Sequence, residues 1–240
     1  MAWFFTEPFS GSYYTIVGED AKHIEKSLRM KAGEEITLVD SNGIQHNGEI
    51  DNITSGNVTV KIKESFKCEN EPNVKVTLYQ ALPKGDKMDF IVQKAVELGV
   101  SEIVPVISAR CISRPDEKSL NKKIQRWQKI ALQASQQSRR GIIPQVKEAV
   151  TFKKAVECLA DDSKNIIFYE CGGDRVGDII TLPCKHINMF IGSEGGFEEQ
   201  EVQQIISKNG NSATLGKRVL RAETAPLAAL AIIMYVTGNA

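Results

Sequence analysis

Near its C-terminus, this chain of 240 residues contains three glycines in the run Met189-Phe190-Ile191-Gly192-Ser193-Glu194-Gly195-Gly196-Phe197. An apolar segment leads into the glycines, and a segment rich in glutamate follows. Glycines at the carboxyl end of a strand let the backbone approach a ligand closely and adopt conformations that are closed to other residues. The run therefore predicts a buried strand, a ligand-binding loop and a helix, a succession typical of α/β folds.

The glycine run lacks two common phosphate-binding patterns. It has neither the G-x-x-x-x-G-K-[ST] of a P-loop nor the G-x-G-x-x-G run with a downstream ribose-binding acid. Carboxylates that would repel a phosphate lie in and beside it, at Glu194, Glu198, Glu199 and Glu201. A ligand of neutral or positive character fits better. An ordinary turn between a strand and a helix would explain the Gly-Gly pair equally well.

From residue 74 onward, short apolar segments alternate with amphipathic ones, which predicts a mostly parallel sheet covered by helices. We expect strands at 74–79, 103–106, 165–169, 187–191 and 213–215. Two helices are expected at 86–98 and 119–136. Their predicted inward residues are Phe90, Ile91, Lys94, Ala95 and Leu98 in the first, and Leu120, Ile124, Trp127, Ala131 and Ala134 in the second.

The N-terminal part has a different pattern. Residues 1–63 read as strands with one helix at 20–29, and Ser41-Asn42-Gly43 supplies residues that tolerate a tight hairpin turn. Residues 64–73 are polar, lack periodicity and contain Pro72. We therefore predict a small β-barrel domain at residues 1–72 and an α/β domain at residues 73–240.

Charge is unevenly distributed, although Lys plus Arg and Asp plus Glu both total 30. Counted as Lys plus Arg against Asp plus Glu, residues 1–72 carry 7 against 12, residues 73–150 carry 14 against 7, and residues 151–240 carry 9 against 11. The basic middle would suit a nucleic-acid backbone, and a solvated helix face would explain part of it equally well.

Cysteine and histidine spacing argues against a disulfide framework and against a metal site. The five cysteines are never closer than thirteen positions, and the three histidines are scattered. No stretch approaches a membrane span, and the first residues lack the basic start of a signal peptide. We expect free thiols, no metal, no membrane contact and a cytoplasmic location.

A second motif follows the glycine run: Leu215-Gly216-Lys217-Arg218-Val219-Leu220-Arg221-Ala222-Glu223-Thr224-Ala225-Pro226. Pro226 suits a first helical turn with Thr224 or Ala225 at its cap, where free backbone N–H groups point outward. Three cations precede that turn. A short strand, a loop and a core helix would account for all of this except the long connection.

Together, the two motifs resemble the C-terminal motifs of the ribosomal RNA small subunit methyltransferase E family. Similarity extends upstream to Leu28-Arg29-Met30, to residues 80–88 and 93–100, to Ser108-Ala109-Arg110-Cys111 and to Trp127-Gln128-Lys129-Ile130. Nearly the whole chain is covered. Ser193 stands where the family usually has proline, and serine should make the loop more flexible and add a donor.

The resemblance implies a PUA-like N-terminal barrel and a C-terminal SPOUT domain whose chain forms a deep trefoil knot. It also implies S-adenosylmethionine-dependent methylation of uridine N3 in small-subunit (16S) ribosomal RNA, within the small ribosomal subunit, by a homodimer. A carboxylate near the positive sulfonium or ammonium would be electrostatically sensible. The cofactor residues that carry over are Tyr169, Glu170, Ile191, Gly192, Glu194, Gly195, Gly196, Leu215, Gly216, Val219, Leu220 and Thr224.

Removal of the uridine N3 proton calls for cations that stabilise the developing oxyanion. Arg221, Arg110 and Arg140 are the catalytic candidates, and phosphate contacts or surface ion pairs explain each of them equally well. The expected RNA-binding residues are Arg29, Lys84, Lys87, Arg114 and Arg126. Three other interpretations stay open: a related enzyme with another RNA target, a non-catalytic ribosome-assembly factor, and a nucleotide-binding enzyme.

Overall fold

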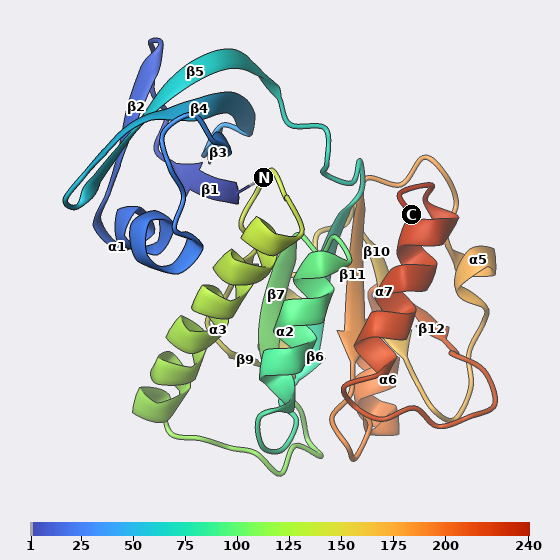
Figure 1. Ribbon diagram of the computed structural model, residues 1–240. Helices are drawn as coiled ribbons and strands as arrows, with labels where there is room; N and C mark the ends of the chain where they lie inside the picture. Colours follow the sequence, from blue (N-terminus) through green and yellow to red (C-terminus); the bar gives the residue numbers. More distant parts are fainter. Residues whose placement is uncertain (1) are drawn as a thin grey trace. The chain divides into compact units, whose positions relative to one another are not determined.

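The computed structural model describes residues 2–240, and the chain divides into two compact units (Figure 1). The N-terminal unit contains the residues up to Glu71 together with Ser135–Ile143. The C-terminal unit contains Pro72–Ala134 and Pro144–Ala240. The first division lies one residue from the expected boundary, whereas nothing in the sequence pattern indicated that residues 135–143 belong with the N-terminal unit.

A curled five-stranded sheet forms the N-terminal unit. Its order is β1-β3-β4-β5-β2, with β1 parallel to β3 and the other pairs antiparallel. The strands are β1 (Ala2–Thr6), β2 (Tyr13–Val17), β3 (Glu35–Asp40), β4 (Ile44–Thr54) and β5 (Asn57–Lys67). Between β2 and β3 lie α1 (Gly18–Lys22) and the π-helical η1 (His23–Leu28), which bury Ala21 and Ile24 against the sheet. This is the PUA-like half-barrel that the resemblance implied.

The segment 135–143 completes this unit through polar contacts. Trp3 Nε1 donates to the carbonyl oxygen of Arg140 at 3.0 Å, and Asn70 Nδ2 donates to that of Arg139 at 2.7 Å. The Arg140 guanidinium is buried and forms an ion pair with Glu71, whose carboxylate also accepts from the Gly141 N–H at 2.8 Å. Buried charge is tolerated only when it is paired, so these contacts fix the segment in place.

The C-terminal unit is built on a parallel sheet of order β12-β10-β11-β6-β7-β8, with β9 also paired to β7. All of its strand pairs are parallel. Its strands are β6 (Lys75–Ala81), β7 (Glu102–Ile107), β8 (Gln145–Val146), β9 (Val150–Thr151), β10 (Lys164–Phe168), β11 (His186–Ile191) and β12 (Asn211–Ala213). The predicted α/β class with a mostly parallel sheet is therefore confirmed, while the trefoil knot stays a prediction.

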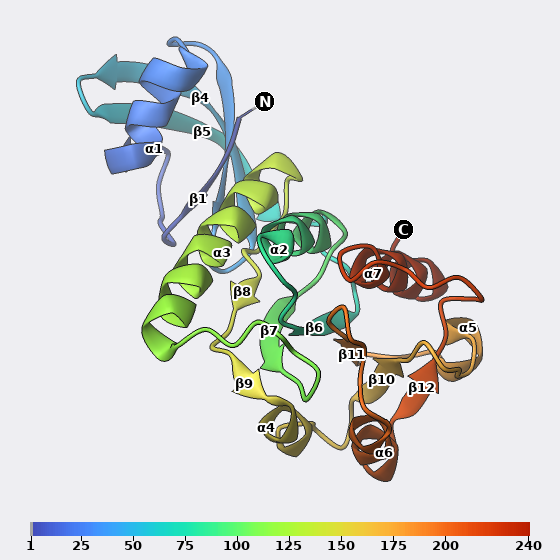
Figure 2. The ribbon, with the colours of Figure 1, turned by 90° about the horizontal axis from the view of Figure 1, so that it is seen from below.

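Helices cover both faces of this sheet, as parallel strands require. They are α2 (Lys87–Glu97), α3 (Glu117–Gln137), α4 (Phe152–Glu157), α5 (Val176–Ile179), α6 (Glu199–Ser207) and α7 (Ala225–Val236). Figure 2 shows α2 and α7 on one face and α4 and α6 on the other. Of residues 2–240, no helix combines the length and apolarity needed to cross a bilayer.

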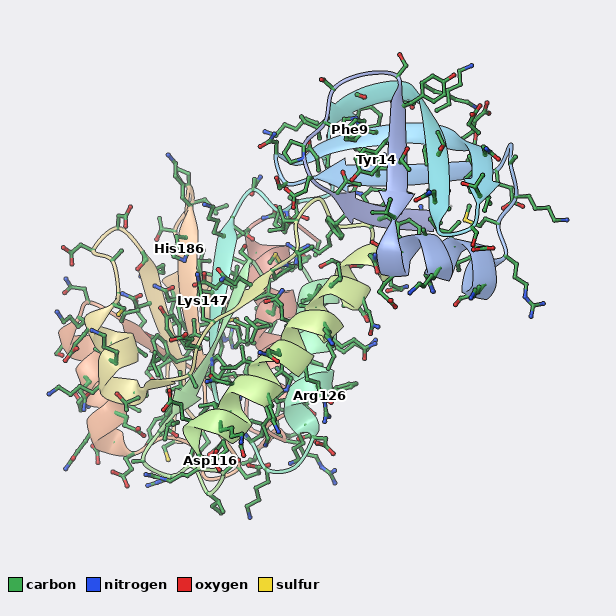
Figure 3. The ribbon with its side chains drawn as sticks, turned by 90° about the vertical axis from the view of Figure 1, so that its left-hand side faces the viewer. Phe9, Tyr14, Asp116, Arg126, Lys147 and His186 are labelled. Atoms are coloured by element: carbon green, nitrogen blue, oxygen red, sulfur yellow. The ribbon has the colours of Figure 1, made fainter. Side chains whose placement is uncertain are left out.

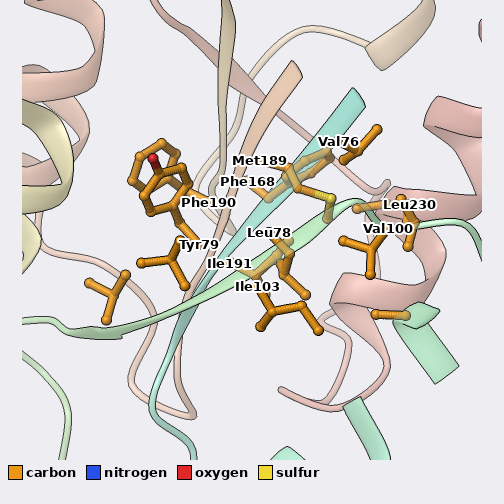
Figure 4. Close-up of a cluster of buried hydrophobic side chains, with 14 of the residues drawn as sticks. Val76, Leu78, Tyr79, Val100, Ile103, Phe168, Met189, Phe190, Ile191 and Leu230 are labelled. Atoms are coloured by element: carbon orange, nitrogen blue, oxygen red, sulfur yellow. The ribbon is translucent and has the colours of Figure 1, made fainter. Parts of the chain in front are cut away.

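Aliphatic and aromatic side chains from the central strands fill the core (Figure 4). Tyr79 and Phe190 stack with ring centroids 4.4 Å apart, and Phe152 contacts both Phe190 and Phe197. Burial raises the pKa of Tyr79 to about 12. The aromatic cluster anchors the end of the glycine-rich loop, which is formed by residues 192–196, because Phe197 follows Gly196 directly.

The predicted inner face of α2 was wrong at its ends. Phe90 and Leu98 are exposed, and the buried residues are Met88, Ile91, Val92, Ala95 and Val96. Lys94 instead pairs with Glu97 on the surface. For α3 the prediction holds, because Leu120, Trp127, Ala131 and Ala134 are buried and Ile124 packs against the core.

Candidate functional site

The carboxyl ends of β10 and β11 and the loop that follows β12 enclose a cavity of about 420 Å³ in the C-terminal unit. This volume lies in the range of small-molecule sites, and the carboxyl ends of parallel strands are where α/β sheets bind ligands. The lining residues are Lys87, Phe168, Tyr169, Glu170, Ile191, Gly192, Ser193, Glu194, Gly196, Thr214, Leu215, Gly216, Lys217, Arg218, Val219, Leu220, Arg221, Ala222 and Ala225.

The glycine-rich loop folds tightly on itself. The Gly196 N–H donates to the Ser193 carbonyl oxygen at 3.0 Å, and Gly196 has φ +65°, a conformation that L side chains rarely adopt. A Cβ on Gly192 would lie 2.9 Å from Gly196 Cα, and a Cβ on Gly196 would lie 2.2 Å from Glu170 Oε1. Glycine is favoured at Gly192 because the backbone of the same loop occupies the place of a Cβ, and at Gly196 because of its positive φ and the adjacent Glu170 carboxylate.

Gly195 is held from outside the cavity by Arg110. The Arg110 Nη1 donates to the Gly195 carbonyl oxygen at 3.1 Å, and a Cβ on Gly195 would lie 3.0 Å from Arg110 Cβ. Neither Gly195 nor the helix-capping Thr224 belongs to the cavity lining. The other ten residues predicted to bind the cofactor all line it.

Ser193 is buried, and its hydroxyl has no hydrogen-bond partner among residues 2–240. Its carbonyl oxygen nevertheless closes the turn to Gly196. Gln80 supports the same loop at the end of β6, because its Nε2 donates to the carbonyl oxygen of Gly192 at 3.3 Å. The flexibility expected from serine at this position stays a prediction.

The loop between β12 and α7 has an irregular backbone. Gly216 has φ +98°, and the Thr214 hydroxyl accepts from the Gly216 N–H at 3.2 Å. Within the described part of the chain, the backbone N–H groups of residues 217–220 have no hydrogen-bond acceptor. All four residues line the cavity, so their N–H groups are candidates to bind a ligand there.

Lys87 links three segments around the cavity. Its Nζ lies 2.8 Å from Glu194 Oε1 in the glycine-rich loop and 3.2 Å from Glu223 Oε2 in the loop before α7. The Lys84 N–H also donates to the Glu194 carboxylate. The hydrogen bonds that Lys87 donates to the carboxylates of Glu194 and then Glu223 raise the pKa of Lys87.

The carboxylates of the site differ in whether a cation neutralises them. Burial would raise the pKa of Glu194, but the hydrogen bonds from Lys87 and from backbone N–H groups outweigh it and hold this pKa low. The backbone N–H of Glu223, and after it Lys87, lower the pKa of Glu223. Glu170 lines the cavity without an ion-pair partner among residues 2–240. Glu170 is thus available to a cationic ligand.

The three arginines proposed for catalysis lie in different surroundings. Arg221 lines the cavity, its side chain is 84% exposed, and its Nη1 is 4.0 Å from Glu223 Oε1. Arg110 contacts the outer side of the glycine-rich loop. Arg140 belongs to the N-terminal unit, where its ion pair with Glu71 gives it a structural role.

The expected RNA-binding residues are also dispersed. Arg126 (Figure 3) pairs with Asp86 and Asp89, and Arg114 donates to backbone carbonyls of residues 108, 109 and 111. Lys84 and Arg29 are exposed, and Arg29 has φ 54° after η1. Lys87 lies in the cavity wall, which its sequence position did not indicate.

Across residues 2–240, no group of three or more His, Cys, Asp or Glu side chains could hold a metal ion, and all five cysteines are free. The cavity residues that were not expected from the sequence are Phe168, Thr214, Ala222 and Ala225, whereas Ser193, Lys217 and Arg218 lie in loops that the resemblance implied without being named singly. The signal for most of them was their place inside the two motifs.

Comparisons with known proteins identify relatives over nearly the whole chain. Family models for an RNA methyltransferase domain and an RNA methyltransferase PUA domain match residues 69–234 and 16–63. The ribosomal RNA small subunit methyltransferase E of Bacillus subtilis is 33% identical over 232 residues, covering 93% of this chain and 90% of its own.

Two solved structures share the fold and contain a ligand. The ribosomal RNA small subunit methyltransferase E of Neisseria gonorrhoeae, bound to S-adenosylmethionine, is 34% identical, has a TM-score of 0.89 and covers 98% of both chains. A methyltransferase of Legionella pneumophila in complex with the same cofactor is 29% identical with a TM-score of 0.86, covering 98% of this chain and 96% of its own.

Proposed function

Because this chain belongs to the ribosomal RNA small subunit methyltransferase E family, we propose that it methylates N3 of a uridine in small-subunit (16S) ribosomal RNA, with S-adenosylmethionine as donor. The observation that carries this proposal is the cavity formed by the glycine-rich loop, the segment after β10 and the loop before α7.

The residues of the cavity fit the donor. Gly192, Gly196 and Gly216 line the cavity and have no side chain, so a ligand there can approach the backbone closely. Free N–H groups of residues 217–220 would bind the adenine edge, and Ile191, Leu215 and Leu220 would contact its apolar faces. Glu170 is the carboxylate that would face the positive charge. When bound, the donor supplies an electrophilic methyl group on a sulfonium.

The protein then has to hold the uracil ring in line with that methyl group and exclude water. Loss of the N3 proton leaves negative charge on the uracil oxygens, and a guanidinium nearby would stabilise it. Arg221 lies in the cavity wall and has only a distant contact with Glu223, so we assign it this role. Arg110 and Arg140 would instead support the loop and the N-terminal unit.

We also propose that the protein acts as a homodimer on the small ribosomal subunit in the cytoplasm. The last helix, α7, exposes Tyr235 at 77% and Ile232 at 39%, and large exposed apolar side chains on a helix suit a protein interface. Pairing through α7 would cover them.

The deciding experiment measures transfer of a labelled methyl group to small ribosomal subunits from a strain that lacks this gene. Mass spectrometry should identify 3-methyluridine as the product nucleoside. The Arg221→Gln variant should bind the donor normally and lose most of kcat. A 2′-O-methyl product would overturn the target assignment, and donor binding without transfer would favour a role as an assembly factor.

A further inference from the structure

We propose that Lys217 and Arg218 form a phosphate-binding rim at the mouth of the cavity, which holds the RNA strand on either side of the target nucleotide. This inference rests on the proposed function and names the part of the chain that grips the substrate. Neither residue was among the RNA-binding residues expected from the sequence.

The position of the two side chains is the first argument. Both line the cavity and both are exposed, so their charges lie where the cavity opens to solvent. Enzymes that act on a base take it out of the helix or act on a single strand, and the backbone stays outside the pocket. Phosphates of the flanking nucleotides would then lie at this mouth.

Charge balance is the second argument. Within residues 2–240, neither Lys217 nor Arg218 forms an ion pair or a side-chain hydrogen bond. By contrast, Lys87 is held by Glu194 and Glu223, and Arg126 by Asp86 and Asp89. A paired cation must give up its partner before it binds phosphate, whereas an unpaired one does not.

The whole chain has a formal net charge of zero, so attraction to a polyanion has to come from local groups. The neighbouring Val219 supports this location, because its side chain lines the cavity and is 84% exposed. An apolar side chain next to two free cations offers a surface for a ribose or base beside their phosphate contacts.

The test uses the full-length double variant Lys217→Ala/Arg218→Ala and transcribed small-subunit ribosomal RNA as the probe. Binding is measured across a range of salt concentrations. Each phosphate contact contributes about 0.7 to the slope of log affinity against log salt for single strands, so the slope should flatten by about 1.4. Donor binding is followed in parallel by thermal shift, because both substitutions keep the backbone N–H groups assigned to the donor and this measurement separates lost RNA contacts from a disturbed cavity.

The matched control is Lys185→Ala/Lys208→Ala, which removes the same charge from exposed lysines that form no ion pair within residues 2–240. Lys185 precedes β11 and Lys208 follows α6, so both lie away from the carboxyl ends of the strands where the cavity forms. This control should keep the wild-type slope and affinity.

Three results would overturn the proposal. The salt dependence of RNA binding could be unchanged in Lys217→Ala/Arg218→Ala, here called the loop variant, or it could flatten equally in the control. The third result is loss of donor binding in the loop variant. A change of oligomeric state with an unchanged slope would instead assign the loop to an interface between copies of the chain. Failure of the proposed function would be seen separately, as absence of methyl transfer by the wild type.

Discussion

Gly196 is the residue where the backbone conformation and the site are most directly connected. Its φ of +65° is unfavourable for other residues, and the Glu170 carboxylate occupies the place of a Cβ. In Gly196→Ala, either the loop or Glu170 has to move. We expect the affinity for S-adenosylmethionine to fall by about tenfold or more, measured by titration calorimetry.

Gly177→Ala is the matched control for this substitution. Gly177 lies in α5, and the nearest atom to its added Cβ would be 4.0 Å away. Its donor affinity should equal that of the wild type. Equal affinities in all three proteins would mean that the glycine-rich loop does not shape the donor site.

We expect His186 to make the stability of the protein depend on pH. It begins β11, its Nε2 lies 3.0 Å from the Thr77 hydroxyl, and it is labelled in Figure 3. Burial, followed by repulsion from Lys75, lowers its pKa from 6.5. The folded state therefore binds this proton less readily than the unfolded state does, and stability is lost as pH falls from 6.5 through the lowered pKa.

In His186→Gln, the part of the loss of stability at low pH that comes from His186 should disappear. Urea unfolding at pH 7 and at pH 5 should show a smaller decrease in the free energy of unfolding for the variant than for the wild type. An identical decrease in both proteins would assign the pH dependence to other groups, such as nearby carboxylates.

Among the elements, the N-terminus of α2 is tied to the two loops that carry the motifs. Lys87 holds Glu194 and Glu223 together, and its removal leaves two carboxylates near each other without their shared cation. We expect Lys87→Met to weaken donor binding by about fivefold, a modest effect because the pair is partly exposed. Lys87→Arg should recover part of the affinity.

Lys153→Met serves as the comparison, because Lys153 is an exposed lysine in α4 without an ion pair in the described chain. It should bind the donor like the wild type. If Lys87→Met instead left donor binding intact and flattened the salt dependence of RNA binding, Lys87 would be a phosphate contact and not a link between loops.

The elements that could be predicted are those with a long periodic pattern or a strong motif. The helix expected at 119–136 matches α3, and the strand expected at 187–191 matches β11. The two-residue strands β8 and β9 are too short to show any period, and they form because β7 offers them an edge. Short elements of this kind depend on tertiary contacts.

The site was predictable where its residues lie inside the motifs, as for Gly192 and Gly196. Lys87 illustrates what sequence cannot show: its partners lie 107 residues away at Glu194 and further still at Glu223, and only the fold brings them together. Arg140 is the opposite case. From the sequence it was a catalytic candidate, a phosphate contact or a surface ion pair, but folding buries it against Glu71.

At the scale of the whole molecule, we expect the buried ion pair between Arg140 and Glu71 to stabilise the N-terminal unit. Glu71→Ala would leave the buried Arg140 guanidinium without its carboxylate and Gly141 without its acceptor. We expect a loss of roughly 2–4 kcal/mol in the free energy of unfolding, since removal of one partner of a buried pair typically costs about 3–5 kcal/mol and Glu71 is partly exposed. Denaturant titration measures it.

Glu69→Ala is a suitable control, because Glu69 is exposed and unpaired in the described residues. It should change stability little. A similar effect of both substitutions would show that stability depends on the negative charge of the segment between β5 and β6, and not on the contact with Arg140.

The two-segment construction of the N-terminal unit also sets an order of events on the ribosome. Its five strands are synthesised first, but Arg140 and Gly141 emerge only after β6, α2, β7 and α3. Until then the Trp3 indole and the Glu71 carboxylate lack the partners that they have in the finished protein. Nascent chains stalled before residue 135 should therefore be cleaved readily by protease within β1, and chains that extend past residue 143 should resist. The N-terminal unit, which is made first, is completed only after residues 72–134 of the C-terminal unit have been made.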